Sequence, residues 1–310
     1  MGKIKAICIS ERRGTQKHCI ENAVLTTDWG IVGDAHGGKW HRQISLLSFD
    51  KIEEFRKKGA EIDFGAFGEN LVVEGFDFRN LPVGTRFQCN DAVLEMTQIG
   101  KECHTHCQIY HKMGDCIMPR EGVFAKVISE GKISVGDELV MLDQREDRPF
   151  QAAVITLSDK GFKGEREDKS GPLLTSILEE QGYEIVETLI LPDEKSRIEK
   201  ELIRLSDGRQ VDLILTTGGT GLSKRDVTPE ATMAVATRNV PGISEAIRAY
   251  SMGITKRAML SRGSSVLRNN TLIINLPGSP KAVKESMEVI SSELVHGLKI
   301  LKGSASECAR

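Results

Sequence analysis

The amino-acid sequence predicts two domains of different fold class: a mostly β, barrel-like domain over residues 1–143 and a three-layer α/β domain with a parallel sheet over residues 150–303. Three observations lead to this prediction. The 310 residues suffice for two ordinary domains. Short β-like runs dominate the first half, whereas strand-like and helix-like segments alternate in the second. Between them, residues 144–149 form a polar linker that ends in proline, and residues 304–310 are left as a tail.

Composition narrows the class of protein. Charged residues make up 28% of the chain and the formal net charge is −2, so the overall field gives no reason to expect a nucleic acid or an anionic membrane as partner. No apolar run approaches the roughly 20 residues of a membrane span, and the N-terminus lacks the hydrophobic core of a signal peptide. We therefore expect a cytoplasmic protein. Seven cysteines in a reducing compartment favour thiol chemistry or metal binding over structural disulfides.

The first half contains six β-like runs and one helical stretch near residues 49–58. Turns rich in Gly, Asp and Asn separate the runs, and this close spacing predicts a barrel or a sandwich. The runs cover residues 4–9, 43–47, 71–73, 92–97, 123–128 and 138–142.

The same half carries polar and glycine motifs that a simple barrel does not need. They are Gly33-Asp34-Ala35-His36-Gly37-Gly38, Arg42, Gly68-Glu69-Asn70, Gly100-Lys101-Glu102-Cys103-His104 and the segment 114–123. In order and spacing these motifs resemble the MOSC family, named for the C-terminal domain of molybdenum cofactor sulfurase. The resemblance spans nearly all of residues 1–143. It implies a β-barrel-like module that carries sulfur or binds molybdenum cofactor, and it aligns the family's cysteine with Cys103.

The surroundings of Cys103 leave two interpretations open. Lys101 and His104 are cationic neighbours that would favour a reactive thiolate. Soft and imidazole ligands are also crowded here, so a zinc site or a site for the cofactor's molybdenum is the alternative, although the spacing matches neither a zinc finger nor a zinc ribbon. The candidate metal ligands are Cys103, His104, Cys107 and Cys116.

The second half alternates strands with helices. This βαβ rhythm predicts right-handed crossovers between parallel strands that are covered by helices on both faces. The expected strands are residues 151–157, 184–191, 211–216 and 271–275, and the expected helices are residues 171–181, 194–205 and 280–301, the last as one helix or two.

A glycine-rich loop follows the strand expected at residues 211–216. Gly218, Gly219 and Gly221 let the backbone turn so that N–H groups form a nest for a phosphate. The loop is neither a Walker loop, because Ser223 precedes the lysine, nor a dinucleotide fingerprint, because Lys224 takes the place of the third glycine. Thr228 and Pro229 are expected as N-cap and first residue of a helix, and Asp226 is placed to hold Mg²⁺ on a nucleotide.

Four strand ends in this half carry polar or glycine residues. Ligands of such sheets gather beyond the carboxyl ends of the strands, so all four ends are expected to face one cleft. Gly278 with Ser279 before the last helix offers a second anion nest. The four ends are Ser158-Asp159, Pro192-Asp193, Thr217-Gly218-Gly219-Thr220-Gly221 and Pro277-Gly278-Ser279.

Over residues 150–303 the motifs resemble the molybdopterin adenylyltransferase family. The motifs are 216–221, Arg225-Asp226 to Glu230, 241–248, Leu260-Ser261-Arg262 and 276–281. The resemblance implies that Mg²⁺-ATP donates AMP to the terminal phosphate of molybdopterin. It places the family's functional aspartates at Asp193 and Asp226, a nucleotide or metal contact at Glu245, and contacts to the pterin phosphate at Ser261 and Arg262.

Two further expectations come from these resemblances. Family members are commonly trimers, which implies a homo-oligomer, and two modules of one pathway in one chain imply contacts with other molybdenum cofactor proteins.

A non-catalytic carrier or insertion module for molybdopterin is the alternative function, because a related domain shares the Gly-Gly-Thr-Gly loop. Ser158-Asp159 near the start of the domain matches the adenylylating branch better.

Overall fold

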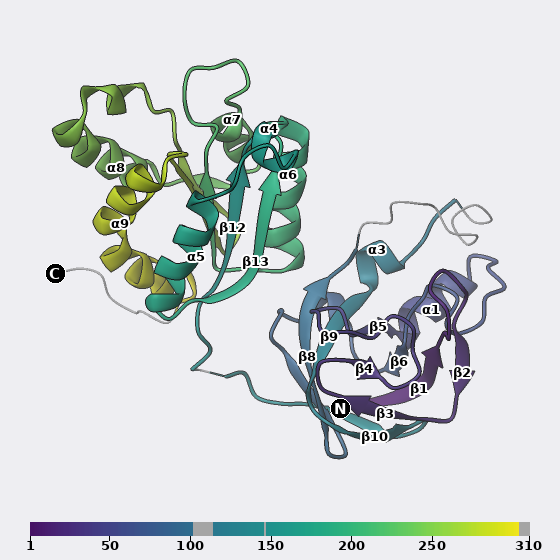
Figure 1. Ribbon diagram of the computed structural model, residues 1–310. Coiled ribbons are helices and arrows are strands. Elements are labelled where there is room, and N and C mark those ends of the chain that lie inside the picture. Colours follow the sequence, from purple (N-terminus) through teal and green to yellow (C-terminus); the bar gives the residue numbers. More distant parts are fainter. Residues whose placement is uncertain (102–113, 146, 304–310) are drawn as a thin grey trace. The chain divides into compact units, whose positions relative to one another are not determined.

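The computed structural model describes residues 1–101, 114–145 and 147–303. The chain divides into two compact units, Met1–Glu146 and Asp147–Arg310 (Figure 1). Cys103, His104 and Cys107 therefore lie outside the described residues. Within those residues, no helix has the length and apolar character needed to cross a membrane.

The first unit is built around a closed β-barrel. Its main sheet has the order β11-β7-β8-β9-β5-β6-β1-β2, and a further pairing of β1 with β11 closes the ring. The strands are β1 (Gly2–Ile9), β2 (His18–Ile20), β3 (Asn22–Thr26), β4 (Gly30–Ile31), β5 (Ile44–Ser48), β6 (Leu71–Glu74), β7 (Arg86–Cys89), β8 (Ala92–Ile99), β9 (Val123–Ser129), β10 (Gly131–Ser134) and β11 (Glu138–Met141). The predicted barrel is thus confirmed.

One pair of neighbouring barrel strands is parallel. β5 and β6 run in the same direction, and the chain needs a long crossover to join them. This crossover contains helix α1 (Phe49–Arg56), which the sequence predicted; two short helices, η1 (Phe78–Asn80) and α3 (Met118–Glu121), were not predicted. Strands β10, β3 and β4 form a separate three-stranded sheet.

Two apolar clusters hold the first unit together. Alternate residues of a strand point to opposite faces, but β1 has an irregularity in its pairing with β6 between Ile4 and Ala6, which shifts this alternation. Ile4 and Ile7 therefore join one cluster, and Ala6 and Cys8 join the other. The first cluster fills the barrel and includes Phe87. The second cluster lies under α1 and α3, whose buried side chains contribute to it.

The second unit is a six-stranded sheet between two helical layers. Its strand order is β13-β12-β14-β17-β16-β15, and its first four strands are parallel. The strands are β12 (Gln151–Leu157), β13 (Glu184–Leu191), β14 (Leu213–Thr217), β15 (Arg238–Asn239), β16 (Ser265–Arg268) and β17 (Thr271–Leu276). The helices are α4 (Asp159–Phe162), α5 (Ser170–Glu180), α6 (Lys195–Ile203), η2 (Arg204–Gly208), α7 (Thr228–Ala234), α8 (Pro241–Ile254), η3 (Lys256–Leu260) and α9 (Pro280–Leu301).

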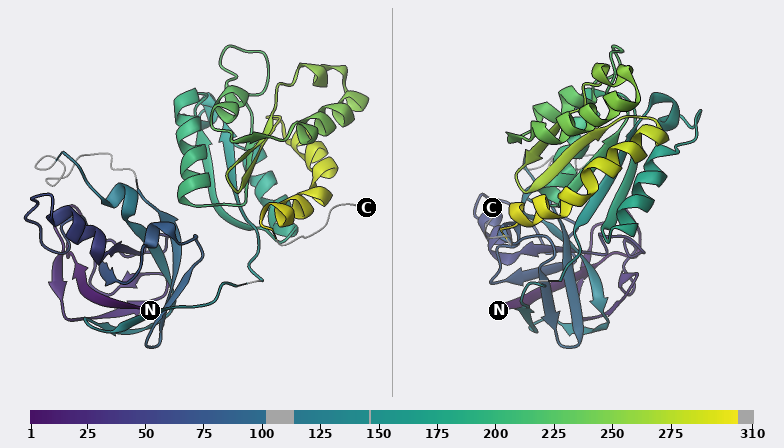
Figure 2. Two further views of the ribbon diagram at one scale, coloured as in Figure 1. Left: turned by 180° about the vertical axis from the view of Figure 1, so that it is seen from behind. Right: turned by 90° about the vertical axis from the view of Figure 1, so that its left-hand side faces the viewer.

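Each face of this sheet buries its own layer of helices (Figure 2). Strand β12 shows the division, because Ala152 and Val154 join the cluster that contains side chains of α5, α8 and α9. Ala153 and Ile155 join the cluster that contains side chains of α6 and α7. The three-layer prediction is therefore confirmed, and residues 280–301 form a single helix.

The four strands expected from the sequence are parallel, as predicted. The sequence did not predict β15 and β16, and these two strands make the sheet mixed instead of wholly parallel. Strand β16 pairs antiparallel with both β15 and β17. Only residues 269 and 270 join β16 to β17, and a connection of two residues can form only a hairpin. Asn269 has a φ of 50°, the left-handed conformation that such tight turns require.

Candidate functional site

The carboxyl ends of the four parallel strands meet at one edge of the second unit's sheet. The two loops that follow β12 and β13 are tied by a reciprocal pair of hydrogen bonds: each of Asp159 and Asp193 donates its main-chain N–H to the other's carboxylate, both at 3.1 Å. The loops that follow β14 and β17 are tied by Thr217 Oγ1, which donates to the Pro277 carbonyl at 2.7 Å. The structure thus brings together all four predicted strand ends.

The loop after β14 requires glycine at two positions. Gly218 and Gly219 have φ values of 103° and 63°, which L-residues with side chains rarely adopt. A Cβ on Gly218 would lie 2.4 Å from the Leu157 carbonyl oxygen, and one on Gly219 would lie 2.2 Å from Thr228 Oγ1. Thr228 itself donates its hydroxyl to the Gly218 carbonyl at 3.0 Å. The main chain of this loop is therefore packed directly against neighbouring strand ends and α7.

Helix α7 begins one residue earlier than predicted. Val227 is its N-cap and Thr228 its first residue, with Pro229 next. The Thr228 hydroxyl bonds to the glycine loop instead of capping the helix, which explains the shift.

The N-terminus of α9 lies beside the glycine loop. A Cβ on Gly278 would lie 3.2 Å from Gly218 Cα. Ser279 is the N-cap and accepts a hydrogen bond from the Ala282 N–H at 3.3 Å. Ser170, which the sequence did not indicate, donates its hydroxyl to the Gly278 carbonyl at 2.9 Å. Two features that bind anions, a glycine loop and a long helix N-terminus, therefore adjoin each other.

Three carboxylates surround this loop. A Cβ built on Gly219 would lie 3.0 Å from Asp193 Oδ1, and one on Gly221 would lie 2.9 Å from Asp226 Oδ2. Burial raises the pKa of Asp193, and the negative charges of Asp159 and Asp226 raise it further. These carboxylates therefore repel one another, which a bound cation would relieve.

Asp159 differs from the other two because Arg225 neutralises it. Arg225 donates from Nε and Nη2 to the two carboxylate oxygens of Asp159, at 3.0 and 2.7 Å. These hydrogen bonds lower the pKa of Asp159. Arg225 lies in one of the motifs that the sequence singled out, but nothing in that motif indicated that it would engage Asp159. Ser158 caps α4 by accepting the Gly161 N–H at 3.0 Å.

Arg262 braces the glycine loop. Its Nε donates to the Gly221 carbonyl at 2.7 Å, and its other guanidinium nitrogens bond to the Asp226 carbonyl and the Glu230 carboxylate. Its main-chain N–H also donates to the Thr220 carbonyl at 2.9 Å. The guanidinium expected to meet a pterin phosphate is therefore engaged by the loop itself.

The remaining two predicted residues lie apart from these contacts. Ser261 is half-buried at the end of η3. Glu245 is exposed on α8, and no hydrogen bond or ion pair links it to the loop in the described part of the chain.

No group of three or more His, Cys, Asp or Glu side chains that could hold a metal ion occurs among the described residues. The carboxylates at this edge nevertheless suit Mg²⁺, which proteins commonly bind through one or two carboxylates together with the phosphates of a substrate. Asp226 Oδ2, which accepts the Ser223 N–H at 2.9 Å, is held in a fixed position for such a role.

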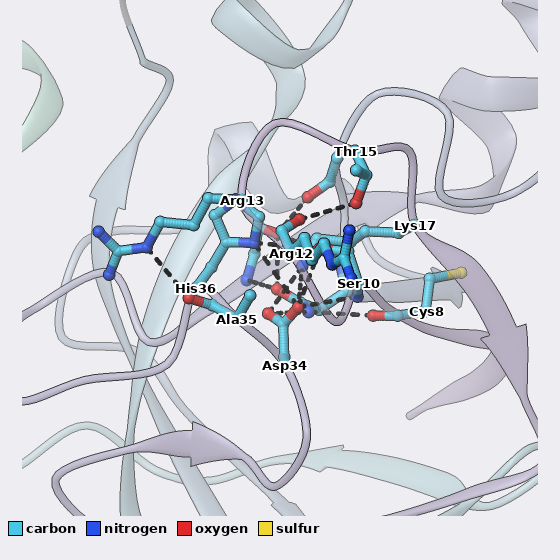
Figure 3. Close-up of polar contacts among 12 residues, drawn as sticks. Cys8, Ser10, Arg12, Arg13, Thr15, Lys17, Asp34, Ala35 and His36 are labelled. Carbon is cyan, nitrogen blue, oxygen red and sulfur yellow. Dashed lines mark hydrogen bonds and ion pairs between the residues drawn. The ribbon is translucent and has the colours of Figure 1, made fainter.

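The first unit contains a second polar site, which we call the barrel cluster. Figure 3 shows four of its members, Ser10, Lys17, Asp34 and His36, and the fifth is Asn70, which bonds to Asp34. Lys17 Nζ donates to both carboxylate oxygens of Asp34, at 2.8 and 2.7 Å. The side chains of this pair are only 3% and 1% exposed. The Ser10 N–H and the Asn70 amide also donate to Asp34, each at 3.0 Å. His36 Nδ1 lies 3.3 Å from Ser10 Oγ.

Burial and pairing act in opposite directions on these charges. Burial would raise the pKa of Asp34, but the hydrogen bonds from Lys17, Ser10 and Asn70 outweigh it and the pKa is lowered. Burial lowers the pKa of Lys17 and of His36. The Asp34 carboxylate is thus the centre on which the cluster's donors converge.

Two family models match this chain. One, described as "Probable molybdopterin binding domain", covers residues 153–296, and the other, the MOSC domain, covers residues 33–140. Molybdopterin adenylyltransferase from Helicobacter pylori strain 26695 is 40% identical over 153 residues, which span 49% of this chain and 87% of that protein. The Escherichia coli K12 protein of the same name is 42% identical over 157 residues, which span 48% of this chain and 80% of that protein.

The chain belongs to the molybdopterin adenylyltransferase family. Its second unit carries this relationship, and its first unit carries the MOSC match. Among solved structures, the molybdopterin biosynthesis enzyme MoaB from Thermus thermophilus is 44% identical, with a TM-score of 0.48, and the match covers 50% of this chain and 97% of that one.

Three residues of the barrel cluster lie within the part of the chain that matches the MOSC domain, residues 33–140. Asp34, His36 and Asn70 belong to motifs that the sequence singled out, and the fold brings them together. Ser10 and Lys17 were missed because residues 10–17 resemble an ordinary polar turn; a buried lysine gives no local signal. Cys116, a candidate metal ligand, is buried in an apolar cluster with Ile117 and Met118.

We expect the Lys17–Asp34 pair to govern the stability of the MOSC unit. Lys17→Met leaves a buried, uncompensated carboxylate and should cost about 3–5 kcal/mol in the free energy of unfolding. Both tryptophans, Trp29 and Trp40, belong to this unit, so urea unfolding followed by tryptophan fluorescence reports on it selectively.

Two controls accompany this measurement. Lys39→Met removes an exposed ion pair with Asp28 and should leave the urea concentration at the midpoint of unfolding unchanged. The double variant Lys17→Met/Asp34→Asn should recover at least half of the lost stability. A Lys17→Met midpoint equal to that of the parent would refute a stabilising role for the pair.

Proposed function

We propose that the second unit transfers AMP from ATP to the terminal phosphate of molybdopterin, with Mg²⁺ bound to the nucleotide and pyrophosphate as the leaving group. The observation that carries this proposal is the convergence of a glycine loop, a long helix N-terminus and three carboxylates at the carboxyl edge of four parallel strands. Family membership through relatives about 40% identical supports it.

The reaction asks for positioning and charge neutralisation. A phosphate oxygen of molybdopterin attacks the α-phosphorus of ATP in line with the departing pyrophosphate, so both anions must be held close together. The loop at Thr217, Gly218, Gly219, Thr220 and Gly221 supplies main-chain dipoles for one set of phosphates. The segment Pro277, Gly278 and Ser279 supplies the N-terminus of α9 for another.

The carboxylates have a complementary task. Asp226 and Asp193 would hold Mg²⁺ together with the phosphates of ATP. Bound there, the ion would offset the negative charge that accumulates on the departing pyrophosphate. Burial, together with the negative charges of Asp159 and Asp226, raises the pKa of Asp193. This favours a bound cation, which would stabilise the carboxylates in their charged form.

The arginines keep these groups in position. Arg225 holds Asp159, whose main-chain N–H in turn donates to Asp193. Arg262 holds the carbonyls of Gly221 and Asp226 and so fixes the shape of the loop. We assign Ser158, Asp159, Ser261 and Arg262 to substrate positioning, and Glu245 to an outer contact with nucleotide or metal.

We expect Asp226→Asn to lower molybdopterin-dependent pyrophosphate release at least about tenfold, because the metal would lose a charged ligand. Asp193→Asn should act similarly, with a larger effect on pterin binding. The measurement is release of pyrophosphate from Mg²⁺-ATP on addition of molybdopterin. Glu179→Gln, which removes an exposed carboxylate on α5, serves as the control and should leave turnover unchanged.

The outcomes separate the two candidate functions. Full turnover by Asp226→Asn would refute the assigned role of this residue. Parent protein that binds molybdopterin but releases no pyrophosphate would overturn catalysis in favour of a non-catalytic carrier or insertion module.

For the MOSC unit we propose that Cys103 either carries sulfur or binds molybdenum cofactor. In the second case its thiolate would contact the molybdenum of the cofactor. We expect Cys103 to be alkylated by iodoacetamide faster than Cys89, which is buried. Metal analysis of protein purified without chelator tests the alternative: stoichiometric zinc that is lost in Cys103→Ser would favour a structural site formed with His104 or Cys107. If Cys103 is neither alkylated nor bound to metal, the proposal fails.

We also propose that the chain forms a homo-oligomer, a trimer, through its second unit. Exposed apolar side chains on α8 and η3 support this proposal: Tyr250, Met252, Ile254, Met259 and Leu260 are between 37% and 58% exposed. Such a group suits burial against another copy of the chain. Contacts with other molybdenum cofactor proteins would use the remaining surface.

Light scattering coupled to size-exclusion chromatography tests the assembly. We expect a trimer for the parent, and smaller species for the double variant Ile254→Glu/Met259→Glu, because each charge would be buried in the interface. Met141→Glu changes an equally exposed apolar residue of the MOSC unit and should remain trimeric. A monomeric parent at micromolar concentration contradicts the proposal.

A further inference from the structure

Two cysteines outside the sites described above face each other in the MOSC unit. Cys8 on β1 and Cys19 on β2 are direct cross-strand partners, and their Sγ atoms lie 3.6 Å apart. Cys8 is fully buried, whereas Cys19 is exposed to solvent. The pair therefore has one thiol within reach of solutes and one held behind it.

The backbone at this pair suits a disulfide. The Cys8 N–H donates to the Asn70 carbonyl at 2.7 Å, and the Cys8 carbonyl accepts from the Asn70 side chain at 3.0 Å. Both main-chain groups of Cys8 thus point away from β2, which makes Cys8 and Cys19 a non-hydrogen-bonded pair. Such pairs have Cα atoms about 4.5 Å apart, within the range of roughly 4.4–6.8 Å that disulfides span.

The two thiols have different environments. Cys8 packs in the apolar cluster with Leu47 and Phe55. Burial raises the pKa of Cys8 well above that of an ordinary thiol, and the neighbouring Cys19 and Glu69 raise it further. Cys19 Sγ is 4.0 Å from the Phe64 carbonyl at the surface. Cys19 is therefore the thiol that meets an oxidant first, and Cys8 is positioned to attack second.

We propose that Cys8 and Cys19 form a redox-active dithiol site that a small-molecule disulfide oxidises to an intramolecular disulfide. With oxidised glutathione, the Cys19 thiolate attacks one sulfur and releases the first glutathione thiolate, which leaves a mixed disulfide on Cys19. Cys8 then attacks the Cys19 sulfur, and the Cys8 proton leaves with the second glutathione. Two protein thiols are oxidised while one glutathione disulfide is reduced to two thiols.

The position of the pair gives this chemistry a structural consequence. Cys8 lies two residues before Ser10, and Cys19 lies two residues after Lys17. Ser10 and Lys17 both bond to Asp34 in the barrel cluster. Figure 3 shows Cys8 close to Ser10 and Lys17. The disulfide would therefore join the two ends of the segment that supplies these donors. The sulfurs have to approach by only about 1.5 Å to reach bonding distance.

Peptide mapping of the full chain tests the proposal directly. The reduced protein is incubated with oxidised glutathione, alkylated under denaturing conditions and digested with trypsin. Cleavage after Lys5, Arg12, Lys17 and Lys39 separates the two cysteines into peptides 6–12 and 18–39, neither of which contains another cysteine. We expect mass spectrometry to find these two peptides linked, and dithiothreitol to return them to separate peptides.

Variants assign the order of attack. Cys19→Ser should leave peptide 6–12 fully alkylated, because the buried Cys8 loses the exposed partner that reacts first. Cys8→Ala should hold Cys19 as a persistent glutathione adduct, and the control Cys89→Ala should still give the linked peptides. Tryptophan fluorescence verifies that each variant is folded. A folded parent in which Cys19 keeps its glutathione adduct, or in which Cys8 links to any other cysteine, overturns the proposal.

Discussion

The close packing of the Gly218 main chain against its neighbours is the contact on which the candidate site of the second unit depends. The missing side chain lets the loop approach the end of β12, while Gly278 brings the start of α9 against Gly218 from the other side. Because β12, β14 and β17 are adjacent and parallel, one loop touches both neighbouring strand ends. Any side chain at Gly218 would meet a carbonyl oxygen that the sheet cannot move without breaking its register.

Charge around this loop is divided between two kinds of residue. Arg225 and Arg262 are committed to protein partners and hold the loops in place. Asp193 and Asp226 are left facing the loop, where their mutual repulsion favours a cation. Because both arginines are bound to the protein, the main-chain dipoles of the loop are already fixed in position and need no reorganisation when a ligand arrives.

The MOSC unit is organised in a similar way around a buried carboxylate. Asp34 receives donors from the segment after β1 and from Asn70 just before β6, so its charge connects parts of the chain that are distant in sequence. The Cys8–Cys19 pair sits at the base of the same segment. In both units, therefore, a glycine- or polar-rich loop is shaped by contacts with distant main-chain groups and charges.

The sequence by itself determined the two-domain order, the strands β1, β5, β6, β8, β9 and β11 of the first unit, the βαβ alternation and the four strand ends, because periodicity and glycine placement are local properties of the chain. Asp34, Asn70, Asp193 and Asp226 could likewise be singled out from their motifs. Only the tertiary structure decided that β16 and β15 run antiparallel, that Arg225 neutralises Asp159, and that Lys17 and Cys8 are buried beside partners 17 and 11 residues away. Those outcomes depend on which strands pair and on how deeply each side chain is buried. Both are set by contacts between distant parts of the chain, so a short window of sequence does not encode them.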